Sequence, residues 1–461
     1  MSEALPDDEL NVDWSIPDPP ILASSWKSWD AHTRPLPHRL DARLGWPEGT
    51  VHVLENAFKK QLGRTIGWDL TTLDKASIQA FEKAAQVFRR GVAVLGKSGV
   101  SRQGHYSIRL VPSWTWDLPR LSRDLMIIDA RVMHSWKIPE APHIVPLALS
   151  ESSKTLETVA QLLEIGHAKA KEGWDGSWVI IGGGIMADTA AFAASLQLKP
   201  FRLVPTTLLA MLDACVGGKT GVNFPPFGKN QVGLFGFPTE VIVAHSWLKT
   251  LPKREWLAGL CEGYKHALLI GDPHLASSLC ELELNSPELI KHLKRLIQLK
   301  VDIVMKDPSE RGVRATLNLG HTLAHAIERV SHINRPDHPI LHGEAVGIGL
   351  LFCLELSLFL GHLTPKIYNS MRVALLRSNL LIKPRQLLKY LGYADLASNE
   401  LIEELLIGIK QDKKARSSDG SDWILLSDWG VVVEQGERFT VSIFDDDFRL
   451  AYRQFIKSWI S

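Results

Sequence analysis

The spacing of hydrophobic and polar positions divides the chain into regions. Between residues 105 and 252, short apolar runs alternate with segments in which apolar residues recur at helical spacing. Such alternation is typical of a parallel sheet covered by helices on both faces, as in Rossmann-like domains. The predicted strands are YSIRLV, DLMIID, SWVIIGGG and FRLVPTTLLA, and the predicted helices are TLETVAQLLEIGHAKAKE and ADTAAFAASL.

From residue 253 to residue 461 the helical spacing dominates, and we predict an all-α domain. The predicted helices include REWLAGLCEGYKHALLI, SPELIKHLKRLIQLKVDIV, LGHTLAHAIERV and HGEAVGIGLLF, with a short β-like piece, DWILLSDWGVVVE, near residues 422–434. The segment 346–363, VGIGLLFCLELSLFLGHL, is apolar enough to suggest a membrane span, but Glu355 lies near its middle. A carboxylate at that depth costs several kcal/mol, so we predict a buried helix instead.

Residues 1–104 form a separate N-terminal extension in this interpretation. Residues 1–50 are rich in Pro and Trp without a clear period, which predicts an irregular arm. Residues 73–94 have helical spacing, with Thr72 or Asp74 available as a cap.

Composition narrows the class of protein. Charged residues make up 22% of the chain and hydrophobic residues 45%, with a net charge of +1, so no global field recruits nucleic acid or an anionic membrane. Four cysteines without a C-x-x-C pair predict neither a zinc knuckle nor a disulfide framework. The acidic N-terminus is unlike a signal peptide. We therefore expect a cytoplasmic protein that binds neither nucleic acid nor membrane.

A glycine-rich turn follows the predicted strand SWVIIG. Gly182, Gly184 and Ala187 give G-x-G-x-x-A, which lets a backbone turn approach a pyrophosphate at a helix N-terminus. The usual acid about twenty residues downstream is absent, so a turn without ligand explains the pattern equally well. Asp129, at the end of LMIID, is either a ribose ligand or a solvated strand-end acid.

The loop DACVGGKTGVNFPPFGKN, residues 213–230, resembles the end of a P-loop. Asp213 occupies the position of the first P-loop glycine, where an acid would face the phosphates. Lys219 and Lys229 still favour an anion in this loop.

His321 and His325 in GHTLAH are four residues apart and share one face of the predicted helix. H-E-x-x-H is absent, and such a pair is often structural. His342 and Glu262 add an imidazole and a carboxylate, and three ligands of this kind with an open position would form a catalytic zinc site. Each of five nearby cationic residues, taken alone, is explained equally well as an ordinary surface charge. Together they indicate a pocket for a phosphorylated, polyhydroxylated substrate. These cations are Lys219, Lys229, Lys265, Lys300 and Arg314.

Several long motifs now occur in one order: GGGIMAD, PTTLLAMLDACVGGKTGVN, GKN, LKTLPKREWLAGLCEGYKHALL, RATLNLGHTLAHAIE, LHGEAVGIG and DKK. Through them, residues 105–435 resemble the sugar phosphate cyclase superfamily, and within it most closely the 3-dehydroquinate synthases. The resemblance implies a dehydroquinate synthase-like fold, NAD and Zn²⁺ (or Co²⁺) as cofactors, and a homodimer.

The resemblance also implies roles for individual residues. Metal ligation falls to Glu262, His321 and His342, so that His325 becomes an acid–base residue and not a ligand. NAD contacts fall to Asp129, Glu151, Lys154, Gly183, Gly184, Asp188, Thr206, Thr207, Trp247, Thr250 and Leu251. The catalytic set is Asp213, Lys219, Lys265, Lys300, Arg314, Asn318 and His325. Substrate or phosphate contacts fall to Lys199, Lys229, Asn230 and Lys414 (or Lys413).

The implied reaction converts 3-deoxy-D-arabino-heptulosonate 7-phosphate to 3-dehydroquinate in the shikimate pathway. NAD oxidises a ring alcohol transiently, phosphate is eliminated, and an intramolecular aldol closes the new ring. Two alternatives remain. One is a sedoheptulose 7-phosphate cyclase that forms a valiolone or a gadusol-type cyclitol, and the other is a metal-dependent NAD polyol dehydrogenase. Lys199, where the family often has an arginine, and the extra residue in NFPPFG are departures that keep the first alternative open.

Overall fold

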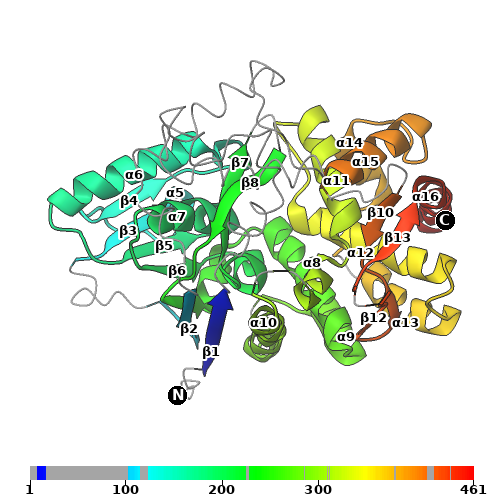
Figure 1. Ribbon diagram of the computed structural model, residues 1–461, viewed down its shortest axis with the longest axis horizontal. Helices are drawn as coiled ribbons and strands as arrows, with labels where there is room; N and C mark the ends of the chain where they lie inside the picture. Colours follow the sequence, from blue (N-terminus) through cyan, green and yellow to red (C-terminus); the bar gives the residue numbers. More distant parts are fainter. Residues whose placement is uncertain are drawn as a thin grey trace, which may run out of the picture. The chain divides into compact units, whose positions relative to one another are not determined.

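The computed structural model describes residues 8–16, 102–114, 123–224, 228–284, 286–308, 310, 312–377, 380–412, 420–436 and 438–460 (Figure 1). The chain divides into two compact units, Met1–Thr250 and Leu251–Ser461. Each unit is described by itself.

The first unit contains a sheet whose described strands run in the order β1-β2-β9-β6-β5-β3-β4, with all neighbours parallel except β1 and β2. Every residue of β3, β5, β6 and β9 is buried, as expected for a parallel sheet covered by helices. The strands are β1 (Asp8–Ile16), β2 (Arg102–Val111), β3 (Leu125–Asp129), β4 (Ile144–Leu147), β5 (Trp178–Gly182), β6 (Phe201–Pro205) and β9 (Glu240–Ala244).

Helix α7 (Gly184–Leu196) packs against β5 and β6, and α6 (Leu156–Lys171) packs beside α7 (Figure 1). The short α5 (Ala130–Ser135) follows β3 directly. These elements confirm the predicted α/β fold, since each predicted strand and helix of this region is present.

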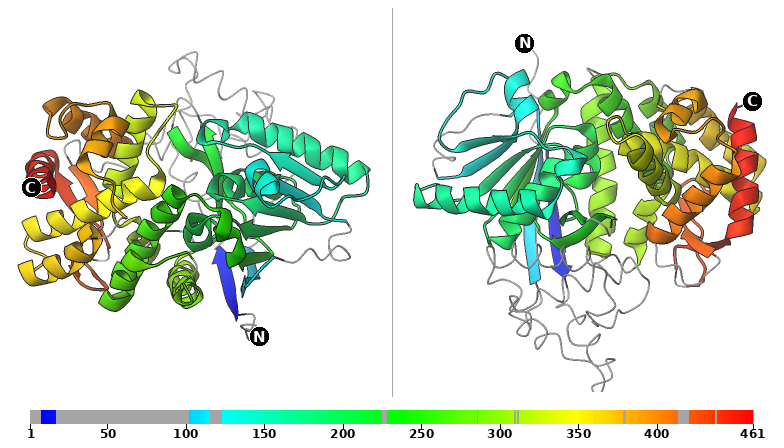
Figure 2. Two further views of the ribbon diagram at one scale, coloured as in Figure 1. Left: turned by 180° about the vertical axis from the view of Figure 1, so that it is seen from behind. Right: turned by 90° about the horizontal axis from the view of Figure 1, so that it is seen from above.

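One segment of the N-terminal extension differs from the expectation. Asp8–Ile16 lies inside the predicted irregular arm but forms β1, which pairs antiparallel with β2, as the side-by-side blue and cyan strands of Figure 2 show. Its Leu10 and Val12 are buried at alternate positions, which is the period of a strand with one face on the core. The predicted helix 73–94 lies outside the described residues.

The predicted phosphate loop at 213–230 is mostly regular structure. A π-helical turn, η3 (Ala210–Ala214), is followed by β7 (Lys219–Phe224), which pairs antiparallel with β8 (Gly228–Phe235). Lys219 therefore begins one strand of a hairpin, and Lys229 and Asn230 lie on the other.

The second unit is mainly helical, as predicted. Its described helices are α8 (Lys253–Ile270), α9 (Pro273–Glu281), α10 (Glu288–Lys306), α11 (His321–Asn334), α12 (His342–Phe359), α13 (Pro365–Arg377), α14 (Pro384–Leu391), α15 (Asn399–Asp412) and α16 (Asp445–Ile460), with a 3-10 turn, η5 (Val313–Asn318). The strands β10 (Gly420–Trp423), β11 (Leu426–Asp428), β12 (Val431–Val432) and β13 (Val441–Phe444) form two small antiparallel pairs.

Helix α12 is the centre of this unit and contacts α8, α11, α13 and α16. By length and composition it could cross a membrane, but 83% of it is buried inside the protein, so it is the predicted buried core helix. Its Glu355 carboxylate accepts hydrogen bonds from the hydroxyls of Tyr368 and Ser458. Phe352 packs against aromatic rings of the C-terminal segment, at Trp423, Phe448, Tyr452 and Phe455.

Candidate active site

Close helix packing brings three predicted metal ligands together in the second unit. Gly343 lies so near α8 that an added Cβ would be 1.9 Å from the Ala258 carbonyl oxygen, and Gly349 lies equally near the carbonyl oxygen of Gly320. The first contact places the start of α12 one turn from Glu262 on α8. The second places α12 against the residue that precedes His321, the first residue of α11.

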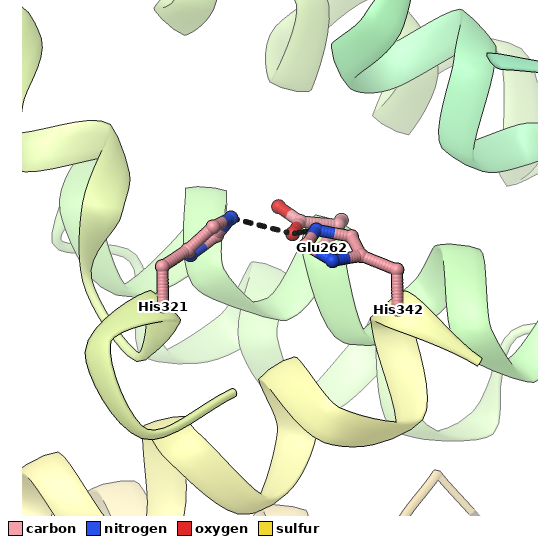
Figure 3. A group of neighbouring side chains, drawn as sticks. All are labelled: Glu262, His321 and His342. Carbon is pink, nitrogen blue, oxygen red and sulfur yellow. Dashed lines mark ion pairs between the residues drawn. The ribbon is translucent and has the colours of Figure 1, made fainter. Parts of the chain in front are cut away.

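Figure 3 shows the two imidazoles on either side of the Glu262 carboxylate. His321 Nε2 and His342 Nε2 each lie 3.4 Å from Glu262 Oε1. The candidate ligand atoms of the three residues lie within 4.8 Å of one another. Glu262 is fully buried, His321 is almost so, and the His342 side chain is 28% exposed. The three donors can therefore meet one cation while one side stays accessible.

The outer nitrogens of both imidazoles are held by acceptors. His342 Nδ1 lies 3.1 Å from the Glu328 carboxylate, and His321 Nδ1 lies 3.1 Å from the Leu319 carbonyl oxygen. An acceptor at Nδ1 holds a proton there and turns Nε2 toward Glu262, as in carboxylate–histidine–metal arrangements. The donor set of two imidazoles and one carboxylate, oriented in this way, fits a catalytic zinc ion.

The charges around the two histidines shift their pKa values in opposite directions. Burial and the nearby Lys265 ammonium lower the pKa of His321 well below its ordinary value. Burial also lowers the pKa of His342, but the Glu328 and Glu262 carboxylates outweigh it and raise the pKa to about 10. The fully buried Lys265 ammonium lies 2.5 Å from Glu262 Oε2. Without metal, the Glu262 charge is thus balanced by neighbouring cations.

Other predicted residues of the second unit gather on neighbouring elements. The His325 ring is 5.4 Å from that of His321 and 5.9 Å from that of His342. Lys300 on α10 and Arg314 on η5 are both buried. The Arg314 guanidinium donates to the Pro308 carbonyl oxygen at 2.8 Å, and the Asn318 amide lies 3.4 Å from the Glu310 carboxylate.

In the first unit, the predicted cofactor residues follow the carboxyl ends of parallel strands. The Ile128–Ile181 pairing places Asp129, at the end of β3, beside the Gly182 turn at the end of β5. An added Cβ on Gly182 would lie 3.5 Å from Asp129 Cβ, and one on Gly183 would lie 3.1 Å from the Thr207 side chain. Thr206 N donates to the Gly182 carbonyl oxygen at 3.0 Å. Ligands of open α/β sheets bind at this edge.

A polar network joins residues that the resemblance assigns to cofactor and to substrate. Lys154 Nζ lies 2.5 Å from Asp188 Oδ2 and 2.5 Å from Asn230 Oδ1. Asn230, at φ +52°, donates its backbone N–H to Asn223, whose amide donates to Glu151 at 2.9 Å. Burial raises the pKa of Asp188 and the Lys154 ammonium opposes that rise. Lys229 Nζ is 4.0 Å from Glu151 Oε1.

Two predicted cofactor residues lie near a further tryptophan. Trp247 is buried in the 3-10 turn η4 (His245–Thr250), and the Trp136 ring meets it edge-on at 4.7 Å. Trp136 Nε1 donates to Thr250 Oγ1 at 2.9 Å.

The remaining predicted residues are placed as follows. Lys199 precedes β6, at the amino edge of the sheet, and its ammonium donates to the Asp175 carbonyl oxygen at 2.8 Å. The structure therefore does not bring Lys199 to the carboxyl edge with the other residues. Asp213 lies in η3, and its charge contributes to the raised pKa of Asp188. Leu251 begins the second unit. Lys413 and Lys414 lie outside the described residues.

Sequence reasoning missed four residues that contact this set: Glu328, Asn223, Trp136 and Arg131. Glu328 and Asn223 are the last residues of two of the quoted motifs, HAIE and TGVN. Their place in these motifs could have indicated a role in the site. Arg131 contacts Asp129, two residues before it. Trp136 gave no signal in the sequence.

Solved structures with a similar architecture are sugar phosphate cyclases. A 2-deoxy-scyllo-inosose synthase complexed with carbaglucose-6-phosphate, NAD⁺ and Co²⁺ matches with a TM-score of 0.62 at 21% identity, over 76% of this chain and 97% of that one. The 2-epi-5-epi-valiolone synthase of Streptomyces hygroscopicus subsp. jinggangensis 5008, with NAD⁺ and Zn²⁺ bound, matches with a TM-score of 0.62 at 22% identity, over 78% and 99%. The fold of this chain is thus that of the sugar phosphate cyclases.

Sequence comparison identifies the family. The 3-dehydroquinate synthase N-terminal model matches residues 144–258, and the C-terminal model matches residues 259–415. The 3-dehydroquinate synthase of Bacillus cereus (strain AH820) is 37% identical over 61% of this chain and 72% of its own length. The chain therefore belongs to the 3-dehydroquinate synthase family.

Other relatives are matched over less of their length. The 3-dehydroquinate synthase of Thermosynechococcus vestitus (strain NIES-2133 / IAM M-273 / BP-1) is 39% identical over 53% of this chain and 66% of its own length. That of Legionella pneumophila (strain Corby) is 43% identical over 45% of this chain and 56% of its own length. The chain thus spans less than two thirds of these two relatives.

Proposed function

We propose that this chain is a 3-dehydroquinate synthase of the shikimate pathway. Its substrate is 3-deoxy-D-arabino-heptulosonate 7-phosphate, and its products are 3-dehydroquinate and inorganic phosphate. The cofactors are NAD and a divalent metal, Zn²⁺ or Co²⁺. A homodimer in the cytoplasm is the expected form of the protein.

The observation that carries the proposal is the Glu262–His321–His342 set, with both imidazoles oriented through Nδ1. The family relationship supports the same reading. When bound, the metal would polarise substrate oxygens and NAD would accept and return a hydride. The chain's own residues supply the binding of anions, the orientation of the ligands and the movement of protons.

Buried cations of the second unit favour a doubly anionic substrate. Lys300 and Arg314 are buried on α10 and η5, and each charge kept away from water favours an anion that reaches it. We assign Lys265, Lys300 and Arg314 to the substrate's carboxylate and phosphate, with Asn318 as a hydrogen-bonding partner. A carboxylate is present in the heptulosonate and absent from sedoheptulose 7-phosphate, so this set supports the heptulosonate.

Proton transfer is assigned to His325. Its ring lies beside the rings of His321 and His342, so it is close to the metal ligands. An imidazole at that position can give a proton to the departing phosphate oxygen and take one from a ring hydroxyl.

In the first unit, we assign NAD to the carboxyl edge of the sheet, with Asp129, the Gly183–Gly184 turn, Thr206 and Thr207. The remaining predicted contacts of this unit, assigned in the same way, are Glu151, Lys154, Asp188, Trp247 and Thr250, and Leu251, the first residue of the second unit, is also assigned to NAD. Asp213, Lys219, Lys229 and Asn230 are assigned to the substrate and its phosphate.

The test measures phosphate release by the purified full chain with NAD and Zn²⁺, offering 3-deoxy-D-arabino-heptulosonate 7-phosphate and sedoheptulose 7-phosphate in separate reactions. We expect phosphate and 3-dehydroquinate from the first substrate only, without net accumulation of NADH. The variant Lys219→Ala is expected to lose phosphate release while its zinc content stays unchanged.

Turnover of sedoheptulose 7-phosphate alone would replace the proposal with a cyclitol-forming cyclase. Net NADH with simple polyols and no phosphate release would make the chain a dehydrogenase. Elution as a monomer in size-exclusion chromatography would refute the expected homodimer.

A further inference from the structure

Asp129, at the carboxyl edge of the sheet, forms an ion pair with Arg131. Arg131 binds it through two parallel contacts, with Nε 3.0 Å from Oδ1 and Nη2 2.6 Å from Oδ2. The Asp129 side chain is only 7% exposed, whereas the Arg131 side chain is 75% exposed. Arg131 Nη2 also lies 3.5 Å from the Leu149 carbonyl oxygen, just beyond the end of the neighbouring β4. The guanidinium therefore covers the outer side of the carboxylate at the ends of β3 and β4.

The position of this pair gives it a role in cofactor choice. In dinucleotide-binding sheets, an acid at the end of the strand beside the glycine turn binds the ribose 2′-hydroxyl. A lone carboxylate there repels a 2′-phosphate, and an arginine nearby accommodates one. Here the acid stands beside the Gly182 turn, and its charge is already matched by a guanidinium.

We infer that Arg131 is a specificity-determining residue, which lets the site bind the 2′-phosphorylated dinucleotide NADP⁺ as well as NAD⁺. This inference rests on the proposed function, because it takes the carboxyl edge of the first unit as the cofactor site. With NAD⁺, Asp129 accepts from the ribose hydroxyl while Arg131 remains on its other side. With NADP⁺, the Arg131 fork turns from Asp129 to the phosphate, for which its geometry is well suited.

Arg131 can change partners because its side chain is largely in water, whereas the Asp129 carboxylate is buried and also accepts a hydrogen bond from the Arg131 backbone N–H at 2.9 Å. The contact of Arg131 Nη2 with the Leu149 carbonyl oxygen is long at 3.5 Å. Arg131→Ala keeps the backbone hydrogen bond to Asp129 and removes the guanidinium from the ribose end of the site.

The experiment is isothermal titration of the full chain with NAD⁺ and with NADP⁺, for the natural protein and for Arg131→Ala and Arg131→Lys. The natural protein is expected to bind the two dinucleotides with Kd values within about 10-fold of each other. In Arg131→Ala the Kd for NADP⁺ should rise about 10-fold or more, as expected for the loss of a charge-assisted hydrogen bond. The Kd for NAD⁺ should stay within about 3-fold. The Kd of Arg131→Lys for NADP⁺ should lie between those of the natural protein and of Arg131→Ala, since lysine keeps the charge but cannot form two parallel hydrogen bonds.

The matched control is Arg123→Ala. Arg123 is a similarly exposed arginine paired with an aspartate, Asp175, but it precedes β3 at the opposite edge of the sheet. Its removal should change neither Kd. Equal effects of the two variants would show a general charge effect and overturn the inference.

Two further outcomes separate this inference from the proposed function. If NAD⁺ binds while NADP⁺ does not, or if Arg131→Ala leaves the ratio of the two Kd values unchanged, the role of Arg131 is wrong and the proposed function stands. If neither dinucleotide binds, the proposed cofactor site itself is wrong, and the inference fails with it.

Discussion

The two polar centres of the molecule are built on different principles. In the second unit, Glu262, His321 and His342 come from helices in close contact, and their donor atoms face one another. In the first unit, Lys154, Asp188 and Asn230 come from a loop, a helix and a strand, and their charges and dipoles already match within 2.5 Å. Each centre holds a lysine ammonium beside a carboxylate, Lys265 in the second unit and Lys154 in the first, but the second-unit centre also places two imidazoles around its carboxylate.

The difference predicts how each centre receives its ligand. Two imidazoles and a carboxylate held by closely packed helices favour a metal cation, which would displace the Lys265 ammonium and the proton that His342 holds without it. A paired network must exchange some of its hydrogen bonds for those of the ligand, so its affinity depends on how well the ligand replaces them. Substitutions in the metal centre should therefore reduce metal binding, whereas substitutions in the paired network should reduce the stability of the fold.

The largest effect is expected from His342→Ala, which removes one of the three proposed metal ligands. Zinc content, measured by atomic absorption, should fall to near zero, and phosphate release should fall by more than the roughly 100-fold typical of losing an outer partner. His338→Ala removes an exposed histidine that stacks on Tyr390 and is the control. Retained zinc would exclude His342 as a ligand.

Lys154→Met tests the paired network and should act on stability. Loss of the ammonium leaves the Asp188 carboxylate, whose side chain is 23% exposed, without its cation, which costs about 1 to 3 kcal/mol at neutral pH. Chemical denaturation at several pH values measures the loss.

The pH dependence of that loss has a definite sign. Burial raises the pKa of Asp188 above its unfolded value, and without Lys154 it rises further. Above the ordinary aspartate pKa, the folded variant therefore holds a proton that the unfolded chain has lost, so its stability falls as pH rises. The deficit relative to the natural protein should be small near pH 4 and grow toward neutrality. A deficit independent of pH would contradict the pairing. Lys169→Met, which breaks an exposed pair with Glu172, is the matched control.

Glu328→Gln should weaken metal binding by about 10- to 100-fold without abolishing it, because an outer partner orients a ligand but does not replace it. Competition with a zinc-binding dye measures the affinity. The expected fold-change is smaller than that of His342→Ala. An affinity equal to that of the natural protein would show that the Glu328–His342 contact does not orient the ring.

The smallest effect is expected from Trp136→Phe. It removes the indole hydrogen bond to Thr250 and keeps an aromatic ring against Trp247, so it should cost about 1 kcal/mol of stability. The Kd for NAD⁺ should change less than in Lys154→Met. A larger loss of NAD⁺ binding would assign Trp136 to the cofactor site itself.

Much of this fold could be predicted from sequence, because the period of apolar residues is set by local geometry. The helices of the second unit and the strands β2, β3, β5 and β6 follow that period. β1, β4, β9 and the β7–β8 hairpin were missed, because these strands are short and lie among Pro, Trp and Gly residues that obscure the alternation. The apolar run that contains Glu355 was assigned correctly because the cost of a carboxylate in lipid decided between two readings.

The metal set could not be derived from spacing alone. His321 and His325 share a helical face, and only the resemblance distinguished a ligand from its neighbour. His342 reaches Glu262 because Gly343 brings two helices into backbone contact, which is a tertiary property. Glu328, Asn223 and Arg131 were missed for the same reason, since each acts through a contact that the order of residues does not display.

Helix α12 begins at the proposed metal ligand His342 and later carries Glu355, whose carboxylate accepts a hydrogen bond from the Ser458 hydroxyl on α16. Phe352 of the same helix packs on three rings of α16. The C-terminal helix α16 thus packs against α12 at the end opposite His342. A truncation before Asp445 would expose both Glu355 and Phe352, so helix α16 supports the helix that carries the proposed ligand His342.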